Sequence, residues 1–466
     1  MEGNVVQSFS EDFSVVWKDP ADGQLTWNWD QMHFPRPVPP LTAEVLQRWL
    51  HEVFMGTRSI FVNGYMYTFE MTLPGPTPEV LERGPFEVFE KEYIPLVREA
   101  CKRLRTADYE SMTPLELADS LDRIITDAND AFRYTMVVVF AFMGPTFELV
   151  DFCEKELGAD GGQLLATLLQ GFQNESAAAG SGLEGLAEVA AGLPEVAAAL
   201  KAGRFDDLDA VTGGPEFLTQ FRTFLDEYGW RAESWGLSHF PTWAENPNDA
   251  LMLIGRYLSD ANLSPAAAIE RSVSQRQEAE REVESRMNGD TLARFKGMLA
   301  ACHGHVSISE GRAFWQLTIM GSLRVPFLAL GRKLVEAGVL DEPNDVFYLD
   351  VEELKAAARG SGSQKSLAQS RRADLERRER LSPPAFVGAP PPPGFPPEIA
   401  GLMTKFFGLG VVPSTEKNVV NGNGASRGSA TGRARIIREL SEAGGWRRAT
   451  YSSAPPQRHR GRRSSP

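Results

Sequence analysis

The sequence predicts a mainly α-helical protein with a small β region near its N-terminus, and three observations support this. From residue 86 to about 358, apolar residues recur at three- and four-residue intervals, which is the period of an amphipathic helix. The best hairpin signal lies well before this region, among aromatic residues and prolines. The hydrophobic fraction of 42% is sufficient for a sizeable core.

Residues 1–85 form the predicted N-terminal aromatic, Pro-rich segment. Trp27–Thr42 contains too many prolines for a helix, so we expect a wrapping segment or a sheet edge. Thr42 is the expected N-cap of the helix that follows. In Phe61–Tyr67 an Asn-Gly pair lies between apolar and aromatic residues, as a type I′ turn requires. This segment therefore predicts a β-hairpin.

Residues 86–360 form the predicted helical domain. Ser264–Met287 is highly charged, and we expect it to lie on the surface or to form one arm of a helical hairpin. The longest apolar run, Met136–Met143, is too short to span a bilayer and is expected to be a buried helix.

Residues 361–415 begin with a polar helix end and continue as a proline-rich run, PPAFVGAPPPPGFPPE. Such a run favours an extended, semi-rigid linker between domains, although it also suits a ligand of recognition modules. Beyond it, the glycines of Gly424–Ile437 permit sharp turns, and Ile436-Ile437 indicates the start of a strand. The alternative for this stretch is a series of plain turns.

Charge and cysteine usage exclude some classes of function. The net charge of −14 argues against a nucleic-acid binder, which normally presents a basic face. The three cysteines show no CxxC spacing and are expected to be reduced, buried thiols of a cytoplasmic protein. The first residues carry no basic start and no apolar core, so no signal peptide is predicted.

One histidine stands out as a candidate for substrate binding. His239 lies in WGLSHFPTW, where an aromatic wall and a base would suit a planar or apolar acceptor. The alternative is a histidine that caps a helix or packs in the core. His33, in the aromatic N-terminal segment, is expected to line the same pocket. The candidate substrate-binding residues are His239, Arg231, Glu233, Trp235, Trp243 and His33.

Two further groups have competing interpretations. The motif Cys302–His305, CHGH, suggests a metal, but no second ligand pair is visible, so a turn or helix end is favoured and no metal site is predicted. Arg312, Arg324 and Arg332 could contact phosphate or pair with acids, and pairing is favoured.

Four stretches resemble the phosphoenolpyruvate-utilising phosphotransferases, a family that includes phosphoenolpyruvate synthase and rifampicin phosphotransferase. They are Phe224–Leu258, Leu330–Leu354, ERRERLSPPAFVG (376–388) and NGNGASRGSATGRARII (421–437). Their order and spacing are also those of the family, and together they cover roughly residues 165–440.

The resemblance implies that residues 86–360 are the acceptor-substrate domain and that residues 416–443 begin an incomplete α/β swivelling domain. In the family, a histidine of that domain carries the phosphoryl group, and an ATP-grasp domain binds the nucleotide. We find neither here, since the resemblance stops near Ala443 and no Gly-rich phosphate loop is visible. We therefore expect no catalytic residue and no bound cofactor in this chain, with ATP and Mg on a separate ATP-grasp-type subunit.

Residues 444–466 are expected to be a basic, disordered tail. From residue 445 the chain has six arginines and no acid. With one choice of synonymous codons, a shifted frame of GWRRATYSSAPPQRHRGRRSSP reads LEEGDILVCATTAPPWTPLF, which resembles the family's next strand and loop. We therefore hypothesise that the tail is out of frame and that the swivelling domain is truncated.

Two functions remain at this point. The first is the acceptor-substrate part of a phosphoenolpyruvate-synthase-like phosphotransferase, acting on a small hydroxyl or keto compound, with an aromatic one favoured. The chain would need its partner and is not expected to be active alone. The alternative is a non-catalytic helical protein that binds a ligand or partner. Neither nucleic acid nor a membrane is an expected partner.

Overall fold

The computed structural model describes residues 5–9, 12–17, 19–69, 75–158, 161–260, 263–390, 419, 431, 433–436 and 450–453. The chain divides into two units. Unit 1 comprises Met1–Thr72 and Leu367–Pro466, and unit 2 is Leu73–Ser366. In the described residues helices predominate and the strands are short, so the predicted mainly α fold with a small β region is confirmed.

Unit 1 contains a four-stranded sheet in the order β4-β5-β3-β6, with antiparallel neighbours, and a separate antiparallel pair, β1-β2. Its elements are β1 (Val5–Ser8), β2 (Ser14–Trp17), η1 (Asp22–Gln24), β3 (Thr26–Trp29), α1 (Pro40–Val53), β4 (Arg58–Val62), β5 (Tyr65–Phe69), α14 (Lys365–Arg378, from Leu367 on), β6 (Phe386–Gly388), β7 (Arg433–Ile436) and β8 (Thr450–Ser453).

The predicted hairpin is confirmed. Asn63 and Gly64 connect β4 to β5 with φ angles of 51° and 81°, and a type I′ turn needs positive φ at both positions. The sheet buries Trp27 and Tyr67 completely. Trp27 Nε1 donates to the Asp22 carbonyl at 2.8 Å, and the Tyr67 hydroxyl donates to the Pro384 carbonyl at 2.9 Å. Each buried polar tip therefore has a partner.

Distant segments meet in this sheet. β6 pairs with β3 in the register Thr26↔Gly388, which joins the N-terminal segment to the stretch just before the proline-rich run. The two segments were predicted as separate regions, because pairing between distant strands leaves no local signal. The expected N-cap at Thr42 is wrong. α1 begins at Pro40, which suits a first helical position, and Thr42 is buried in the first turn.

Few residues beyond 390 are described. β7 pairs in parallel with β8. A strand is present where one was expected, but it begins at Arg433 and Ile436 is its last residue and not its first. Ile437, most of the glycine-rich stretch and the linker at 391–415 lie outside the described residues. The prediction of a disordered tail is wrong for Thr450–Ser453, because these residues pair with β7 along their whole length.

Unit 2 is helical. Its elements are α2 (Pro78–Arg83), α3 (Pro85–Val88), η2 (Phe89–Tyr93), α4 (Ile94–Thr106), α5 (Pro114–Leu157), α6 (Gly161–Leu168), α7 (Glu175–Ala191), α8 (Pro194–Lys201), η4 (Phe205–Asp207), α9 (Gly214–Tyr228), α10 (Asn248–Tyr257), α11 (Pro265–Arg286), α12 (Gly289–Glu336), η6 (Pro343–Tyr348) and α13 (Val351–Ala358).

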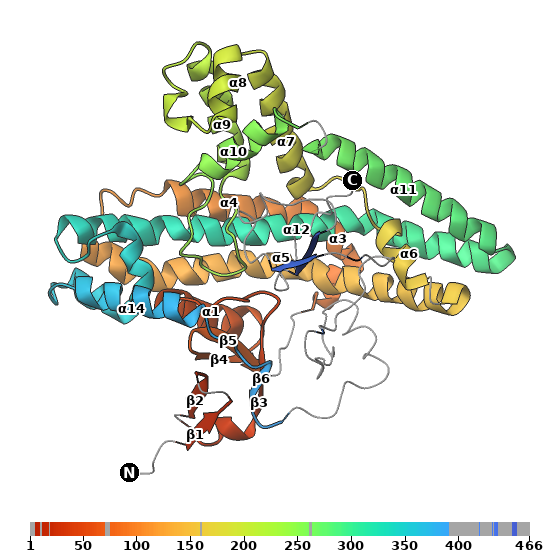
Figure 1. The fold of residues 1–466 in the computed structure, drawn as a ribbon. Helices are drawn as coiled ribbons and strands as arrows, with labels where there is room; N and C mark the ends of the chain where they lie inside the picture. The colour runs from red at the N-terminus through yellow and green to blue at the C-terminus, as the bar shows by residue number, and fades with distance from the viewer. Residues whose placement is uncertain are drawn as a thin grey trace. The chain divides into compact units, whose positions relative to one another are not determined.

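Three helices, α4, α5 and α12, pack side by side, and α7–α10 form a group with its own apolar core (Figure 1). α5 starts at a capping box. Thr113 Oγ1 accepts from the Glu116 N–H at 3.2 Å, and Glu116 Oε2 accepts from the Thr113 N–H at 2.8 Å. α11 buries only Pro265, Ala279 and Val283, so the predicted charged surface helix is confirmed.

Within the described residues, two helices, α5 and α12, are long and apolar enough to cross a membrane by length and composition alone. The apolar window of α12 is 83% buried inside the protein and that of α5 is 47% buried, and core helices of globular proteins pass the same test. Polar residues interrupt both helices, so the length of the longest uninterrupted apolar run, Met136–Met143, does not predict them. The absence of a membrane partner stays a prediction.

Candidate functional site

The six predicted site residues come from both units. Five belong to unit 2, in or beside residues 229–247, which we call the anchored loop and which joins α9 to α10. His33 belongs to unit 1, where its Nδ1 lies 2.9 Å from Asp30 Oδ1. Its role in a shared pocket stays a prediction.

Within the anchored loop, His239 is half-buried among aromatic rings. Its ring centroid lies 4.1 Å from that of Phe240 and 6.4 Å from that of Tyr348. Trp243 packs instead against the core of α7–α10, with its ring 6.5 Å from Phe224. Glu233 is exposed and Trp235 is half-buried.

A buried arginine of α12 holds this loop. Arg324 is 1% exposed, and its Nε donates to Glu245 Oε2 at 2.8 Å. Its Nη1 donates to the Ser238 carbonyl, and its Cζ lies 4.9 Å from the Phe347 ring centroid. The cation therefore has a carboxylate, a carbonyl and an aromatic face as partners, which is what a buried charge needs.

The start of the loop lies directly on the backbone of α12. The Ala232 N–H donates to the Leu317 carbonyl at 2.9 Å, and a Cβ at Gly321 would overlap the Trp230 carbonyl oxygen. Only a glycine at position 321 permits this approach. The next side chain, Arg231, donates from Nη1 to Ser176 Oγ at 3.2 Å, at the N-terminal end of α7.

Arg231 thus leads to a second group of side chains, which we call the α12 polar cluster. Its members come from α5, α7, α12 and the anchored loop. They are Thr135, Glu175, Ser176, Arg231, Gly311, Arg312, Trp315 and Gln316.

Glu175 is the acidic member of this cluster. Its Oε1 accepts from Trp315 Nε1 at 3.1 Å, and its Oε2 occupies the space that a Cβ at Gly311 would need. The Arg98 Cζ lies 4.9 Å from the centroid of the Trp315 ring. Burial, with the negative charge of Glu227, raises the pKa of Tyr228, and Glu175 acts in the same direction, so this phenol stays protonated at neutral pH.

Arg312 is the basic member. Its Nη1 donates to Gln316 Oε1 at 3.0 Å, and Gln316 Nε2 donates to Thr135 Oγ1 at 2.8 Å. The Nε of Arg312 is buried and has no hydrogen-bond partner among the described residues. Burial lowers the pKa of Arg312 to about 10, although the negative charge of Glu310 opposes this effect. A cation without a carboxylate partner is costly to bury, so its presence requires an explanation.

The predicted pairing of the three arginines is therefore correct for two of them. Arg324 pairs with Glu245, and Arg332 Nη2 lies 3.0 Å from Glu110 Oε1. The prediction is wrong for Arg312, which has no carboxylate within 4.0 Å among the described residues. Its polar partner is an uncharged amide on its own helix.

The histidines of the CHGH motif have structural partners. His303 Nε2 lies 2.8 Å from the Leu168 carbonyl oxygen, and the His305 ring stacks on Phe86 at 3.6 Å. Burial lowers the pKa of His305. The expected turn or helix end is wrong, because Cys302–His305 lies inside α12. Across the described ranges, no group of three or more His, Cys, Asp or Glu side chains could hold a metal ion.

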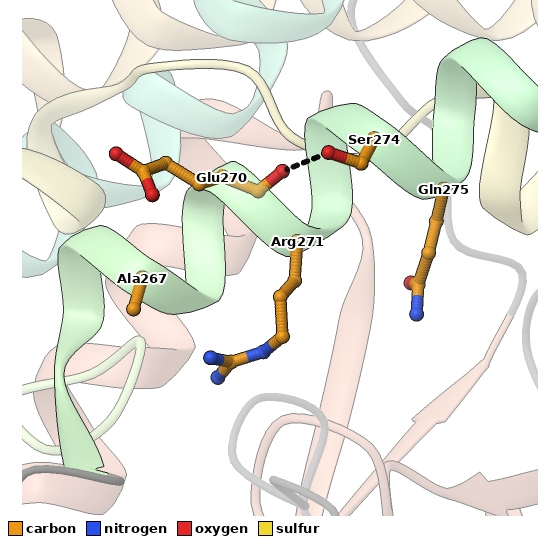
Figure 2. A pocket seen from close by; sticks show the side chains of 5 residues that line it. All are labelled: Ala267, Glu270, Arg271, Ser274 and Gln275. Atoms are coloured by element: carbon orange, nitrogen blue, oxygen red, sulfur yellow. Dashed lines mark hydrogen bonds between the residues drawn. The ribbon is translucent and has the colours of Figure 1, made fainter.

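One hollow of unit 2 is shallow, lies on α11 and is lined by none of the residues above. Figure 2 shows its five lining side chains, which all come from one helix: Ala267, Glu270, Arg271, Ser274 and Gln275. Because a single helix face supplies every contact, we give more weight to the α12 polar cluster, where four elements converge.

Comparison with known proteins matches residues 134–310 to the fourth domain of rifampicin phosphotransferase. Chondramide synthase cmdD of Chondromyces crocatus is 26% identical over 478 residues, which cover 92% of this chain and 12% of that protein. Rifampicin phosphotransferase of Streptomyces sviceus is 27% identical over 246 residues, 51% of this chain and 27% of that protein.

A third relative, the uncharacterised phosphotransferase YvkC of Bacillus subtilis, is 26% identical over 242 residues, 51% of this chain and 28% of that protein. The chain thus spans about a quarter or less of the length of these relatives. The matched range contains half of the α12 polar cluster, namely Thr135, Glu175, Ser176 and Arg231, and ends just before Gly311 and Arg312. These matches support assignment of the chain to the phosphoenolpyruvate-utilising phosphotransferase family, with rifampicin phosphotransferase among its relatives.

Proposed function

We propose that unit 2 is the acceptor-substrate part of a phosphotransferase. In this proposal a histidine on a separate domain or chain brings the phosphoryl group, and ATP and Mg are bound by an ATP-grasp-type partner. The acceptor is a small molecule with a hydroxyl or keto group. Family membership supports the type of reaction, and the state of Arg312 supports the location of the site.

Arg312 is the observation that carries the proposal. Phosphoryl transfer depends mainly on positioning and on neutralising charge on the phosphoryl oxygens. A guanidinium fits these oxygens, and Arg312 still has a buried Nε–H without a partner. An arriving phosphoryl group would supply the anion that the folded chain does not. The i,i+4 contact with Gln316 holds the cation in place without neutralising it.

An aromatic acceptor suits the surroundings of the cluster. The Phe314 ring lies 5.2 Å from Trp315 and 5.9 Å from Tyr228, edge to face in both cases. Phe314 and Trp315 are buried, so the half-buried Tyr228 is the ring of this group that can present apolar area to an acceptor near Glu175. A phenol or a larger aromatic alcohol is therefore the favoured acceptor, and rifampicin is a rational probe because two relatives are named for it.

The test uses a small donor, so that no partner protein is needed. The chain is incubated with 1-phosphoimidazole, which mimics phosphohistidine, and with phenol, hydroquinone or rifampicin, and ³¹P NMR follows new phosphate esters. Arg312→Met is compared with Arg332→Met, which removes an exposed arginine of the same helix. We expect the original chain and Arg332→Met to accelerate transfer and Arg312→Met to lose most of the acceleration.

Two results would count against the proposal. Equal transfer by Arg312→Met would remove Arg312 from the site. No transfer by the original chain to any acceptor, together with tight binding of one of them, would favour a non-catalytic ligand-binding protein instead.

The predictions of an out-of-frame tail and of a cytoplasmic location are tested separately. Sequencing of the gene across codons 438–450 decides whether the tail is out of frame, and an unbroken frame would end that hypothesis. The cytoplasmic location stays a prediction that fractionation of expressing cells can check.

A further inference from the structure

The carboxylate of Glu175 is as unusual as the guanidinium of Arg312. It accepts from the uncharged indole of Trp315, and no cation lies within 4.0 Å of it among the described residues. Arg312 likewise contacts an uncharged amide. The Glu175 carboxylate lies against Gly311, and Arg312 is the next residue of α12. They nevertheless do not pair with each other.

The surroundings hold this carboxylate in place at some cost to the helix. Gly311 lies within α12, where a glycine is less favourable than alanine. Glycine leaves room there for Glu175 Oε2, while the indole N–H of Trp315 holds Oε1. Oε2 therefore has no hydrogen-bond donor among the described residues and can accept a proton.

The side chains in and beside the α12 polar cluster range from exposed to fully buried. Arg98 is exposed, Glu175 and Arg231 are half-buried, and Gln316 and Thr135 are 0% exposed. A ligand entering from the Arg98 side would therefore reach Glu175 at the half-buried level of the cluster. The other charged or titratable groups near these two residues are Tyr228 of α9 and Glu310 of α12.

We propose that Glu175 is the general base that activates the acceptor hydroxyl, an inference that rests on the proposed function. The hydroxyl proton passes to Glu175 Oε2 as the acceptor oxygen attacks phosphorus. The new O–P bond forms, the N–P bond to the donor imidazole breaks, and the imidazole leaves with the electron pair of that bond. Arg312 faces the phosphoryl oxygens, and Glu175 later releases its proton to water.

The first test separates base catalysis from binding. Glu175→Gln keeps an acceptor for the Trp315 indole but cannot take up a proton. With 1-phosphoimidazole and the best acceptor, we expect kcat to fall by ~100-fold or more, the usual contribution of a general base. We expect the affinity for 1-phosphoimidazole to change little. Arg312→Met should show the reverse pattern, with the larger loss in donor affinity.

A second variant asks whether a free carboxylate restores the rate. Glu175→Ala opens space beside Gly311, and added acetate should return part of the lost activity, whereas acetate should not change Glu175→Gln. The indole ¹H–¹⁵N signal of Trp315, assigned with Trp315→Phe, checks the contact without any turnover. It should shift with pH in the original chain and stay constant in Glu175→Gln.

The outcomes distinguish the two proposals. Two results would overturn the role of Glu175 as general base while leaving the proposed acceptor site intact. One is full activity of Glu175→Gln, and the other is a Trp315 signal with the same pH dependence in Glu175→Gln as in the original chain. No transfer by the original chain would overturn the proposed function and this inference together.

Discussion

Two arginines of the same helix differ in their surroundings. Arg324 is fully buried and is bonded to Glu245 and to the Ser238 carbonyl. Twelve residues earlier, Arg312 has one uncharged partner and a buried Nε without any among the described residues. The difference indicates that Arg324 belongs to the architecture and that Arg312 is held ready for an external anion. A half-buried arginine whose buried Nε has no partner in the described part of the chain marks a candidate site more clearly than aromatic sequence motifs did.

The largest expected loss of stability comes from replacing Arg324, whose charge already has partners in the fold. Arg324→Met leaves the Glu245 carboxylate without its cation and frees the anchored loop, so the free energy of unfolding should fall by about 3–5 kcal/mol. Urea denaturation measures this. A loss below about 1 kcal/mol would mean that the loop does not depend on Arg324.

A smaller loss of stability is expected from Gly321→Ala, at the point where the anchored loop packs on α12. The methyl group of Gly321→Ala would overlap the Trp230 carbonyl, which is backbone and cannot rotate away, and overpacking of this kind costs about 1–3 kcal/mol. Thermal unfolding checks it. Since alanine favours the helix itself, an unchanged or higher Tm would show that the loop is not seated on α12.

Gly311→Ala provides the contrast in the α12 polar cluster. Here the new methyl group meets the end of the flexible Glu175 side chain, which can move. We expect the unfolding free energy to change by less than about 1 kcal/mol, because the helical preference of alanine offsets the displacement. Transfer to the acceptor should nevertheless fall, by ~10-fold or more, because a shift of about 1 Å in a reacting group is costly. Unchanged kinetics would place Glu175 outside the site.

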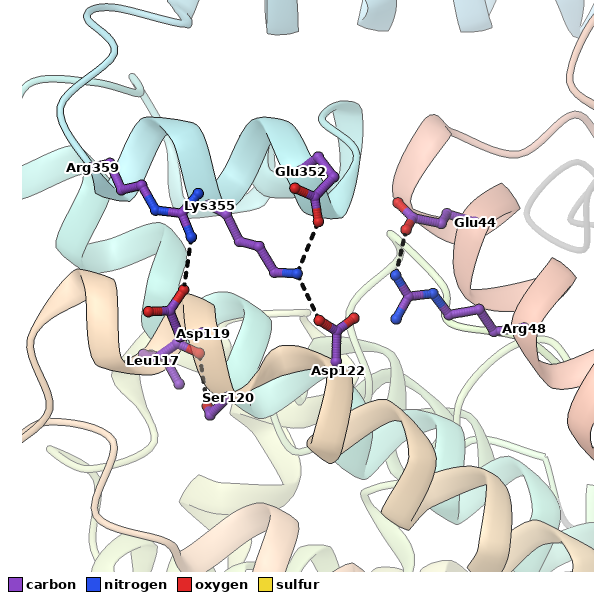
Figure 3. Close-up of polar contacts among 9 residues, drawn as sticks. All are labelled: Glu44, Arg48, Leu117, Asp119, Ser120, Asp122, Glu352, Lys355 and Arg359. Atoms are coloured by element: carbon purple, nitrogen blue, oxygen red, sulfur yellow. Dashed lines mark hydrogen bonds and ion pairs between the residues drawn. The ribbon is translucent and has the colours of Figure 1, made fainter.

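The smallest effect is expected where unit 2 carries an ordinary ion pair. Figure 3 shows Lys355 Nζ between Asp122 Oδ2 at 2.6 Å and Glu352 Oε1 at 2.9 Å. Hydrogen bonds to these two carboxylates raise the pKa of Lys355. The resulting stabilisation is present below the unfolded pKa of ~10.4 and is lost as pH rises through the folded value.

Lys355→Met should therefore lower stability by about 0.5 kcal/mol at pH 7, a value typical of partly exposed pairs. The difference from the original chain should disappear at an alkaline pH above the folded pKa, which lies higher than the unfolded value of ~10.4. Urea denaturation at both pH values tests this, and a constant difference would contradict it.

Much of the fold could be predicted because its signals are local. The Asn-Gly turn, the charged helix α11 and the helical period of unit 2 each depend on neighbouring residues. The pairing of β6 with β3 and the course of α12 through Cys302–His305 depend on tertiary contacts, and the sequence pattern was silent or misleading there.

The site was predicted only in part, for the same reason. Arg231 was a candidate and does reach the α12 polar cluster, but Glu175 was missed because it meets Trp315 from a helix far away in sequence. For the arginines, residue type alone could not separate Arg312 from Arg324, since each lies near acidic residues in the sequence or in space. The distinction is whether a carboxylate lies within reach, and only the fold determines that.

The most direct test measures two quantities on Arg312→Met and Arg324→Met, namely the free energy of unfolding and the affinity for 1-phosphoimidazole. Arg312→Met should keep or exceed the original stability, because it removes a buried charge without a partner, and should lose most of its affinity. Arg324→Met should lose stability, as predicted above. If Arg312→Met is destabilised as much as Arg324→Met and still binds 1-phosphoimidazole as tightly as the original chain, Arg312 is a structural residue and the proposed site is wrong.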